Sequence, residues 1–160
     1  MRHWTLLLVL LAFMSGACGS NEWVDQHNVY RCMHGVPEVK WSSSLAEVAT
    51  WRANNCSQCD HCMCEGSSCQ SIHSHDYAEN ATCYVASAAD AVDAWYSEIG
   101  NYDYANPVFS NSTGHFINVV VNTATKVGCA CNEDAGHCSC DYDSQYGTTL
   151  QALSQVVLPR

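Results

Sequence analysis

Two histidines and two glutamates of this 160-residue chain stand in short motifs that could bind a divalent metal or carry out acid–base chemistry. His115 follows a glycine and opens an apolar run, and Glu98 ends the segment AWYSE (94–98). His73 precedes a serine, and Glu79 lies in the middle of the segment AEN. Neutral imidazoles together with carboxylate oxygens suit Zn²⁺ or a similar borderline ion. If the fold brings these four side chains together, we expect a metal site or an acid–base site.

In the metal interpretation, His73 and His115 are direct ligands, and Glu79 and Glu98 orient them or hold a bound water. Metal binding requires neutral imidazoles, so we expect zinc affinity to fall as the pH drops through about 6.5, the ordinary pKa of histidine. Equal affinity at about pH 5 and pH 8 would contradict this assignment.

Two other interpretations of the same residues stay open. A zinc-dependent hydrolase would activate water through the metal or through a His–Glu pair, with Glu79 or Glu98 as the base. The chain has no Gly-x-Ser-x-Gly motif, so the sequence gives no support for a serine nucleophile. In the third interpretation the four side chains hydrogen-bond one another and form a structural polar network.

Three helices and a group of strands must position these residues. Helices are predicted at about 21–33, from the capping-box pattern at 44–47 onward, and at about 88–99. Glu98 lies about 80° from the centre of the apolar stripe of the third helix, where a carboxylate would line a cleft. Residues 115–122 are apolar on both faces, which favours a central strand covered on each side.

A hairpin is predicted from residues 127–142. Its cysteines are placed symmetrically about the turn, so Cys129 lies opposite Cys140 and Cys131 lies opposite Cys138. We therefore expect the disulfides Cys129–Cys140 and Cys131–Cys138. Two adjacent bridges on one ladder would be crowded, so swapped pairings stay open.

The beginning of the chain and its cysteine content indicate export. Residues 1–17 have the features of a signal peptide, with cleavage after residue 19 as an alternative, and 18–160 are expected to form a single domain. Twelve cysteines fit an oxidising compartment. The dense cluster at 56–69 is expected to form disulfides, since metal sequestration there would require reduced thiols. No later segment has membrane-spanning length. We expect a secreted, extracellular protein.

The net charge of the chain excludes some classes of binding partner, and its sequons mark candidate glycosylation sites. Six Lys and Arg against sixteen Asp and Glu give a formal net charge of −10, so the chain lacks the cations that neutralise nucleic-acid phosphates. Acidic membrane surfaces are disfavoured for the same reason. Glycosylation sequons begin at Asn55, Asn80 and Asn111, and Asn111, in a polar loop, is the best glycan candidate.

Taken in order, these motifs resemble the CAP superfamily of cysteine-rich secretory proteins, insect venom allergens and plant pathogenesis-related proteins, whose shared unit is the SCP domain. The resemblance covers nearly the whole mature chain, up to the segment VVLP near its end. It rests on His27, Asn28, Arg31, Lys40, Trp41, Leu45, Trp51, Cys56, His73, Ser74, Glu79, Asn80, the segment 94–98, Gly114, His115, Phe116, Gly128 and Cys129.

The resemblance implies an α+β fold, namely a disulfide-rich, three-layer α–β–α sandwich with a central antiparallel sheet. It also implies that His73, Glu79, Glu98 and His115 converge in one cleft. His73 is preferred because it precedes a serine, as in the family pattern, and His75 is the alternative. The implied function is that of an extracellular binding protein. Zinc or another divalent cation, sterols or other lipids, and extracellular proteins are its candidate ligands and partners.

Three positions depart from the family pattern. Ala78 stands where the family usually has glycine, and Asn118 and Val121 stand where it has glutamine and tryptophan. We expect these changes to leave the fold in place and to affect the shape of the cleft.

Overall fold

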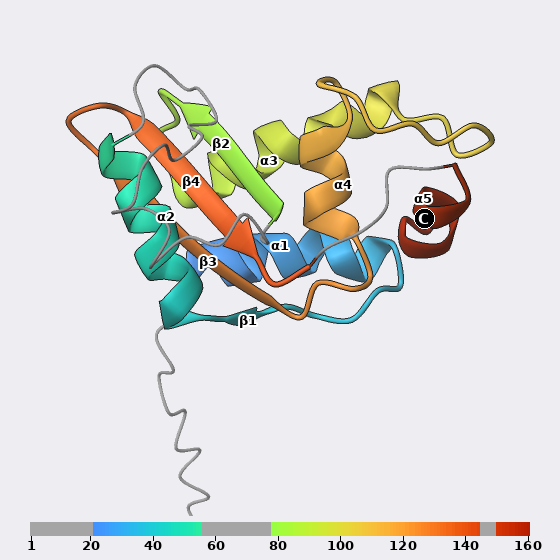
Figure 1. Ribbon diagram of the computed structural model, residues 1–160, viewed down its shortest axis with the longest axis horizontal. Coiled ribbons are helices and arrows are strands. Elements are labelled where there is room, and N and C mark those ends of the chain that lie inside the picture. Colours follow the sequence, from blue (N-terminus) through green and yellow to red (C-terminus); the bar gives the residue numbers. More distant parts are fainter. Residues whose placement is uncertain (1–20, 56–77, 145–149) are drawn as a thin grey trace, which may run out of the picture.

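The computed structural model describes residues 21–55, 78–144 and 150–160. The signal peptide expected at 1–17, the cysteine cluster at 56–69, and both His73 and His75 lie outside these described residues. In chain order the elements are α1 (Glu22–Met33), β1 (Lys40–Trp41), α2 (Ser43–Asn55), β2 (Ala78–Cys83), α3 (Ala88–Ser97), the 3₁₀ helix η1 (Glu98–Asn101), α4 (Gly114–Val120), β3 (Lys126–Asn132), β4 (His137–Tyr142) and α5 (Leu150–Val156) (Figure 1).

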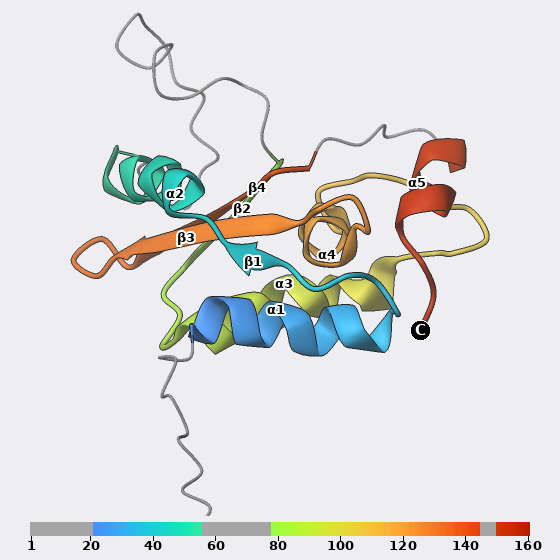
Figure 2. The same cartoon turned by 90° about the horizontal axis from the view of Figure 1, so that it is seen from below.

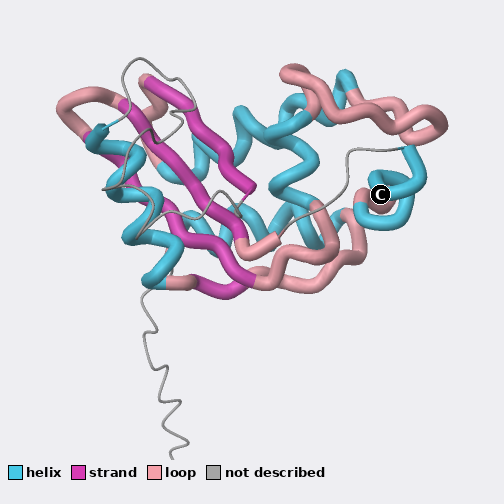
Figure 3. Tube along the Cα trace, in the orientation of Figure 1, coloured by secondary structure: helices cyan, strands magenta, loops and turns pink. Residues whose placement is uncertain are grey.

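The four strands form one sheet in the order β1-β3-β4-β2. β4 pairs antiparallel with both of its neighbours, and the short β1 pairs parallel with β3. The strands β2, β3 and β4 lie side by side at one end of the molecule, and α4, α5 and the long loop before α4 lie at the other (Figure 3). The fold is α+β.

Helices cover the sheet on both faces. α2 lies on one face, and α1 and α3 lie together on the other (Figure 2). The hydrophobic core joins α1, α3 and α4 to the sheet, and its bulkiest fully buried side chains are Trp95, Phe116, Ile117, Tyr142 and Leu153. None of the helices that the structure describes is long and apolar enough to cross a membrane.

The first and third predicted helices are confirmed. In α1 the Asn21 side chain accepts a hydrogen bond from Val24 N at 3.4 Å, and in α3 Ser87 accepts one from Asp90 N at 3.1 Å. These side chains satisfy amide groups that have no partner within the helix. α3 ends at Ser97, and the chain continues as η1, so Glu98 lies just beyond the α-helix that we predicted to contain it.

α2 begins earlier than its capping-box pattern indicates. Ser42, rather than Ser44, is the capping residue, and its hydroxyl accepts from Leu45 N at 3.4 Å. The start of this helix lies directly on β3 at Gly128, where an added Cβ atom would stand 2.1 Å from Ala46 N. Only glycine allows this approach of helix and strand.

The predicted hairpin is confirmed, including its register. Cys129 pairs with Cys140, and Cys131 pairs with Cys138, across the β3–β4 ladder. Both pairs form the expected disulfides. The swapped pairings are therefore wrong.

The predicted central strand at 115–122 is wrong, because these residues form the seven-residue helix α4 followed by a turn. Every residue from Phe116 to Val121 is at most 5% exposed, so the segment is buried on all sides, and its nearly apolar sequence has no periodicity to separate helix from strand. Its β-branched residues favoured a strand by propensity. Contacts with distant residues at both ends of α4 stabilise the helix instead.

Candidate functional site

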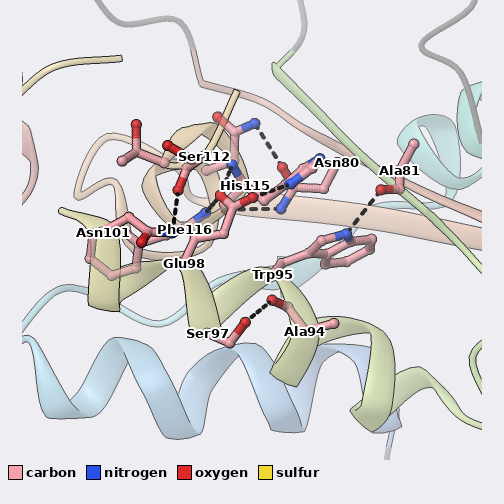
Figure 4. Close-up of polar contacts among 12 residues, drawn as sticks. Asn80, Ala81, Ala94, Trp95, Ser97, Glu98, Asn101, Ser112, His115 and Phe116 are labelled. Atoms are coloured by element: carbon pink, nitrogen blue, oxygen red, sulfur yellow. Dashed lines mark hydrogen bonds and ion pairs between the residues drawn. The ribbon is translucent and has the colours of Figure 1, made fainter. Parts of the chain in front are cut away.

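Glu98 and His115 form a close pair where η1 meets the start of α4 (Figure 4). Glu98 Oε1 accepts a hydrogen bond from His115 Nδ1 at 2.8 Å. Its other oxygen accepts from the backbone amides of His115 and Phe116, at 2.9 and 3.2 Å. The two side chains are 16% and 26% exposed, so the pair lies at the edge of the core and within reach of solvent.

Two charged side chains hold α4 at its ends. Glu98 binds the amides of the first turn, and Arg31 binds carbonyl groups at and just beyond the last turn. The Arg31 guanidinium donates to the carbonyls of Val119, Val121 and Ala124 at 2.8–3.0 Å. A carboxylate at the amino end and a cation at the carboxyl end both match the dipole of the helix. Arg31 is fully buried, and this burial lowers its pKa to about 10.

The pairing with Glu98 fixes the chemistry of the His115 ring. Because an ionised carboxylate only accepts hydrogen bonds, Nδ1 bears the proton and the neutral ring has its lone pair on Nε2. The indole of Trp95 stacks near the imidazole with ring centroids 6.5 Å apart, and its Nε1 donates to the Ala81 carbonyl at 3.1 Å. A histidine held by a carboxylate through one ring nitrogen is the usual arrangement of a metal-binding imidazole.

Glu79 lies on β2, and its carboxylate binds partners that the sequence did not suggest. One oxygen accepts from Arg52 Nη1 of α2 at 2.9 Å, and the other accepts from Ser139 of β4 at 3.1 Å. Asp141 is the residue opposite Glu79 on β4, and it lies 3.2 Å from Arg52 Nε without the alignment of a hydrogen bond. Burial raises the pKa of Asp141 to about 7, against the attraction of Arg52.

A buried polar network connects β2 to α4 and α1, and sequence reasoning missed it. Asn80 donates to the Tyr142 hydroxyl at 3.1 Å, and this hydroxyl lies 2.8 Å from His27 Nε2. Asn118 of α4 donates to the Asn80 side-chain oxygen at 2.8 Å. The usable signal in the sequence was a lone asparagine within an apolar run, which indicates a buried amide with fixed partners.

The structure therefore brings two of the four predicted site residues, Glu98 and His115, into direct contact. It places Glu79 on the neighbouring strand with Arg52 and Ser139 as partners. Within the described ranges, no group of three or more His, Cys, Asp or Glu side chains is arranged to hold a metal ion. A complete metal site thus stays a prediction, because His73 lies outside those ranges.

The sequence is similar to that of a known protein family over most of its length. Residues 24–142 match the family described as "Cysteine-rich secretory protein family". "Repressed by EFG1 protein 1" of Candida albicans is 39% identical over 111 residues, which are 69% of this chain and 39% of that protein. "Protein PRY2" of Saccharomyces cerevisiae is 34% identical over 146 residues, which are 88% of this chain and 41% of that protein. The chain thus spans about two fifths of the length of these fungal relatives.

Solved structures share the fold. The hookworm platelet inhibitor matches with a TM-score of 0.65 at 22% identity, over 86% of this chain and 75% of that one. A structure titled "NaASP2 with Zn2+" matches with a TM-score of 0.54 at 14% identity, over 76% of each chain. Both agree with the sandwich of helices on a central sheet described above. The chain belongs to the cysteine-rich secretory protein family, also called CAP.

Proposed function

We propose that this chain is a secreted extracellular binding protein, and that the Glu98–His115 pair is part of a divalent-metal site with zinc as the first candidate ion. The hydrogen bond from His115 Nδ1 to Glu98, at 2.8 Å, is the observation on which the proposal depends. It holds the imidazole in the tautomer that binds metals through Nε2. The structure titled "NaASP2 with Zn2+" is a protein of the same fold prepared with this ion.

The donor set fits such an ion. His115 supplies the ring nitrogen, and the proposal adds His73 as the second imidazole. Glu79 fits as a carboxylate that holds a bound water. Its oxygens accept hydrogen bonds from Arg52 and Ser139, and these contacts hold the carboxylate in one orientation. A zinc ion at this site would supply a positive charge that attracts anionic or carbonyl-bearing groups of a ligand.

Binding is favoured over hydrolysis by the role of Glu98. Both of its oxygens accept hydrogen bonds from α4, one from the His115 ring and the other from two backbone amides. These contacts make Glu98 a residue that positions the histidine rather than a base that takes a proton from water. Sterols or other lipids, and extracellular proteins, are further partners that family membership suggests.

A calorimetric titration of Zn²⁺ into the mature, oxidised protein tests the proposal. We expect one-to-one binding, abolished in the His73→Ala/His115→Ala double variant. Glu98→Gln should weaken binding by about 10–100-fold, because the ring loses its charged partner. Asp134→Asn is the matched control, since this exposed carboxylate lies in the hairpin turn between β3 and β4.

The same titration, repeated at two pH values, measures the effect of histidine protonation on zinc affinity. Affinity should be lower at about pH 5 than at about pH 8, because protonated imidazoles do not bind metal. A wild-type protein that binds no zinc, or binding that is unchanged in the double variant, would refute the proposed site. In that case the Glu98–His115 pair would be a structural contact at the start of α4.

A further inference from the structure

Two buried asparagines join β2 to α4 beside the proposed site. Asn80 is 0% exposed and Asn118 is 5% exposed. Asn118 Nδ2 donates to the backbone carbonyl of Glu79 at 3.0 Å, and Asn80 Nδ2 donates to the backbone carbonyl of His115 at 3.0 Å. Each asparagine thus binds the backbone of the site residue on the opposite element, and Figure 4 shows Asn80 beside His115.

The two amides are also bonded to each other. Asn118 Nδ2 donates to Asn80 Oδ1 at 2.8 Å, and the second N–H of Asn80 donates to the Tyr142 hydroxyl at 3.1 Å. All four N–H bonds of the pair are therefore used. A reversed amide at position 118 would bring its oxygen against two acceptors, so the network itself fixes the orientation of both side chains.

The direction of the hydrogen bonds continues to α1. The Tyr142 hydroxyl accepts from Asn80, so its own proton is directed to His27 Nε2 at 2.8 Å. His27 Nδ1 then donates to the Trp23 carbonyl at 2.6 Å. The asparagine pair is therefore connected to α1 by a continuous series of hydrogen bonds that runs through Tyr142 and His27.

The pair is separate from the two charges that hold the ends of α4. Glu98 ties the helix to η1, and Arg31 ties it to α1. Within the described ranges, every side-chain hydrogen bond between α4 and β2 belongs to Asn80 or Asn118. The two amides thus supply the polar connection between these elements, beside the apolar packing of α4 in the core.

We propose that Asn80 and Asn118 are positioning residues, which fix the backbones of Glu79 and His115 relative to each other and so set the geometry of the site. The expected effect of these two asparagines on metal binding rests on the proposed function. Asn118 stands where the family resemblance led us to expect glutamine, one methylene longer. The spacing it sets between α4 and β2 is thus a feature of this sequence.

The test replaces Asn118 and measures both geometry and binding. Asn118→Leu keeps the approximate volume and removes both N–H donors. NMR of the metal-free protein reports the proximity of the His115 backbone to β2, and calorimetry with Zn²⁺ alone reports affinity. We expect the cross-relaxation peaks between His115 and β2 to change while those between His115 and Glu98 persist. Zinc affinity should fall by about 10–100-fold.

Three further variants separate positioning from stability. Asn118→Gln keeps the two donors and should recover part of the lost affinity, whereas Asn118→Asp has no N–H and should not. Asn28→Leu is the matched control, because Asn28 also binds backbone groups, the N–H and C=O of Val39 at 2.8 and 3.1 Å, away from the site. This control should lose stability but keep its zinc affinity.

The results of these measurements support or overturn the positioning role of Asn80 and Asn118. Unchanged peaks in Asn118→Leu together with an affinity within twofold of wild type would overturn it. If the wild-type protein binds no zinc, the proposed function fails and the metal-free NMR comparison alone decides whether the amides position His115. If Asn118→Leu does not fold, Asn118→Ser is examined by the same two measurements.

Discussion

Between pH 7 and pH 5, two buried groups should change the stability of this protein in opposite directions. Burial lowers the pKa of His27 to about 4 and raises the pKa of Asp141 to about 7. As the pH falls from about 6.5 towards 4, His27 becomes protonated in the unfolded chain but stays neutral in the folded protein. Acidification therefore stabilises the unfolded chain, and the free energy of unfolding decreases. At position 141 the folded protein keeps a proton that the unfolded chain releases, so stability falls as the pH rises from about 3.8 towards 7.

The two contributions are of similar size. Since one pKa unit corresponds to 1.36 kcal/mol, lowering the pH from 7 to 5 should cost about 2 kcal/mol through His27. The same change should return about 2 kcal/mol through Asp141, because its carboxyl group no longer has to ionise in the core. These two terms should largely cancel in the wild-type protein.

Urea unfolding at pH 7 and pH 5 separates the two groups when each is removed in turn. Asp141→Asn should lose about 2 kcal/mol more than wild type on acidification, since only the histidine contribution is left. His27→Phe should gain about 2 kcal/mol relative to wild type over the same interval. The difference between the two pH values is the readout, so the fixed cost of each substitution cancels. His34, whose pKa burial also lowers, is present in all three proteins and cancels as well. Equal pH dependence in all three would refute this account of the two groups.

Other substitutions test the packing. Arg31→Met should cost about 4 kcal/mol in urea unfolding, because three buried carbonyl groups, those of Val119, Val121 and Ala124, lose a charged donor. A loss below about 1 kcal/mol would show that α4 does not depend on Arg31. Gly128→Ala should lower the free energy of unfolding by about 3 kcal/mol or more, since the added Cβ would overlap the α2 backbone. Gly100→Ala, with open space around the added atom, should lower it by less than about 1 kcal/mol. Equal losses in the two variants would contradict the close approach of α2 to Gly128. Glycopeptide mapping of secreted protein should find a glycan at the exposed Asn111 and none at the fully buried Asn80, and occupancy at Asn80 would be incompatible with the folded network.

The elements that the sequence predicted correctly depend on local signals. The cysteines of the hairpin are symmetric about its turn, so their spacing alone determined which residues lie opposite each other. The third helix has a strong apolar stripe, and Ala91, Val92 and Trp95 of that stripe are buried as expected. In these cases the pattern along the chain already contains the geometry.

The errors concern residues whose state depends on distant partners. α4 is helical because Glu98 and Arg31 bind its ends, and Arg31 lies 88 residues before the Val119 carbonyl that it binds. Neither contact leaves a trace in the local pattern of an apolar run. The partners of Glu79 were missed for the same reason, since Arg52 and Ser139 come from two other elements. The resemblance to a family supplied the Glu98–His115 pair, which spacing alone would not have identified.

The dependence of α4 on remote side chains has a consequence for folding. A helix of seven residues is too short to persist alone in water, so α4 cannot act as an early local nucleus. It can form only once α1 and η1 are in place, which makes it one of the late, high-contact-order parts of the fold. The amides of His115 and Phe116 should then be protected from exchange only while their contact with Glu98 is in place, and both should become exposed together when it opens. The His115 ring would therefore reach its place beside Glu98 only after α1 and η1 have docked, so it would be among the last parts of the fold to become ordered.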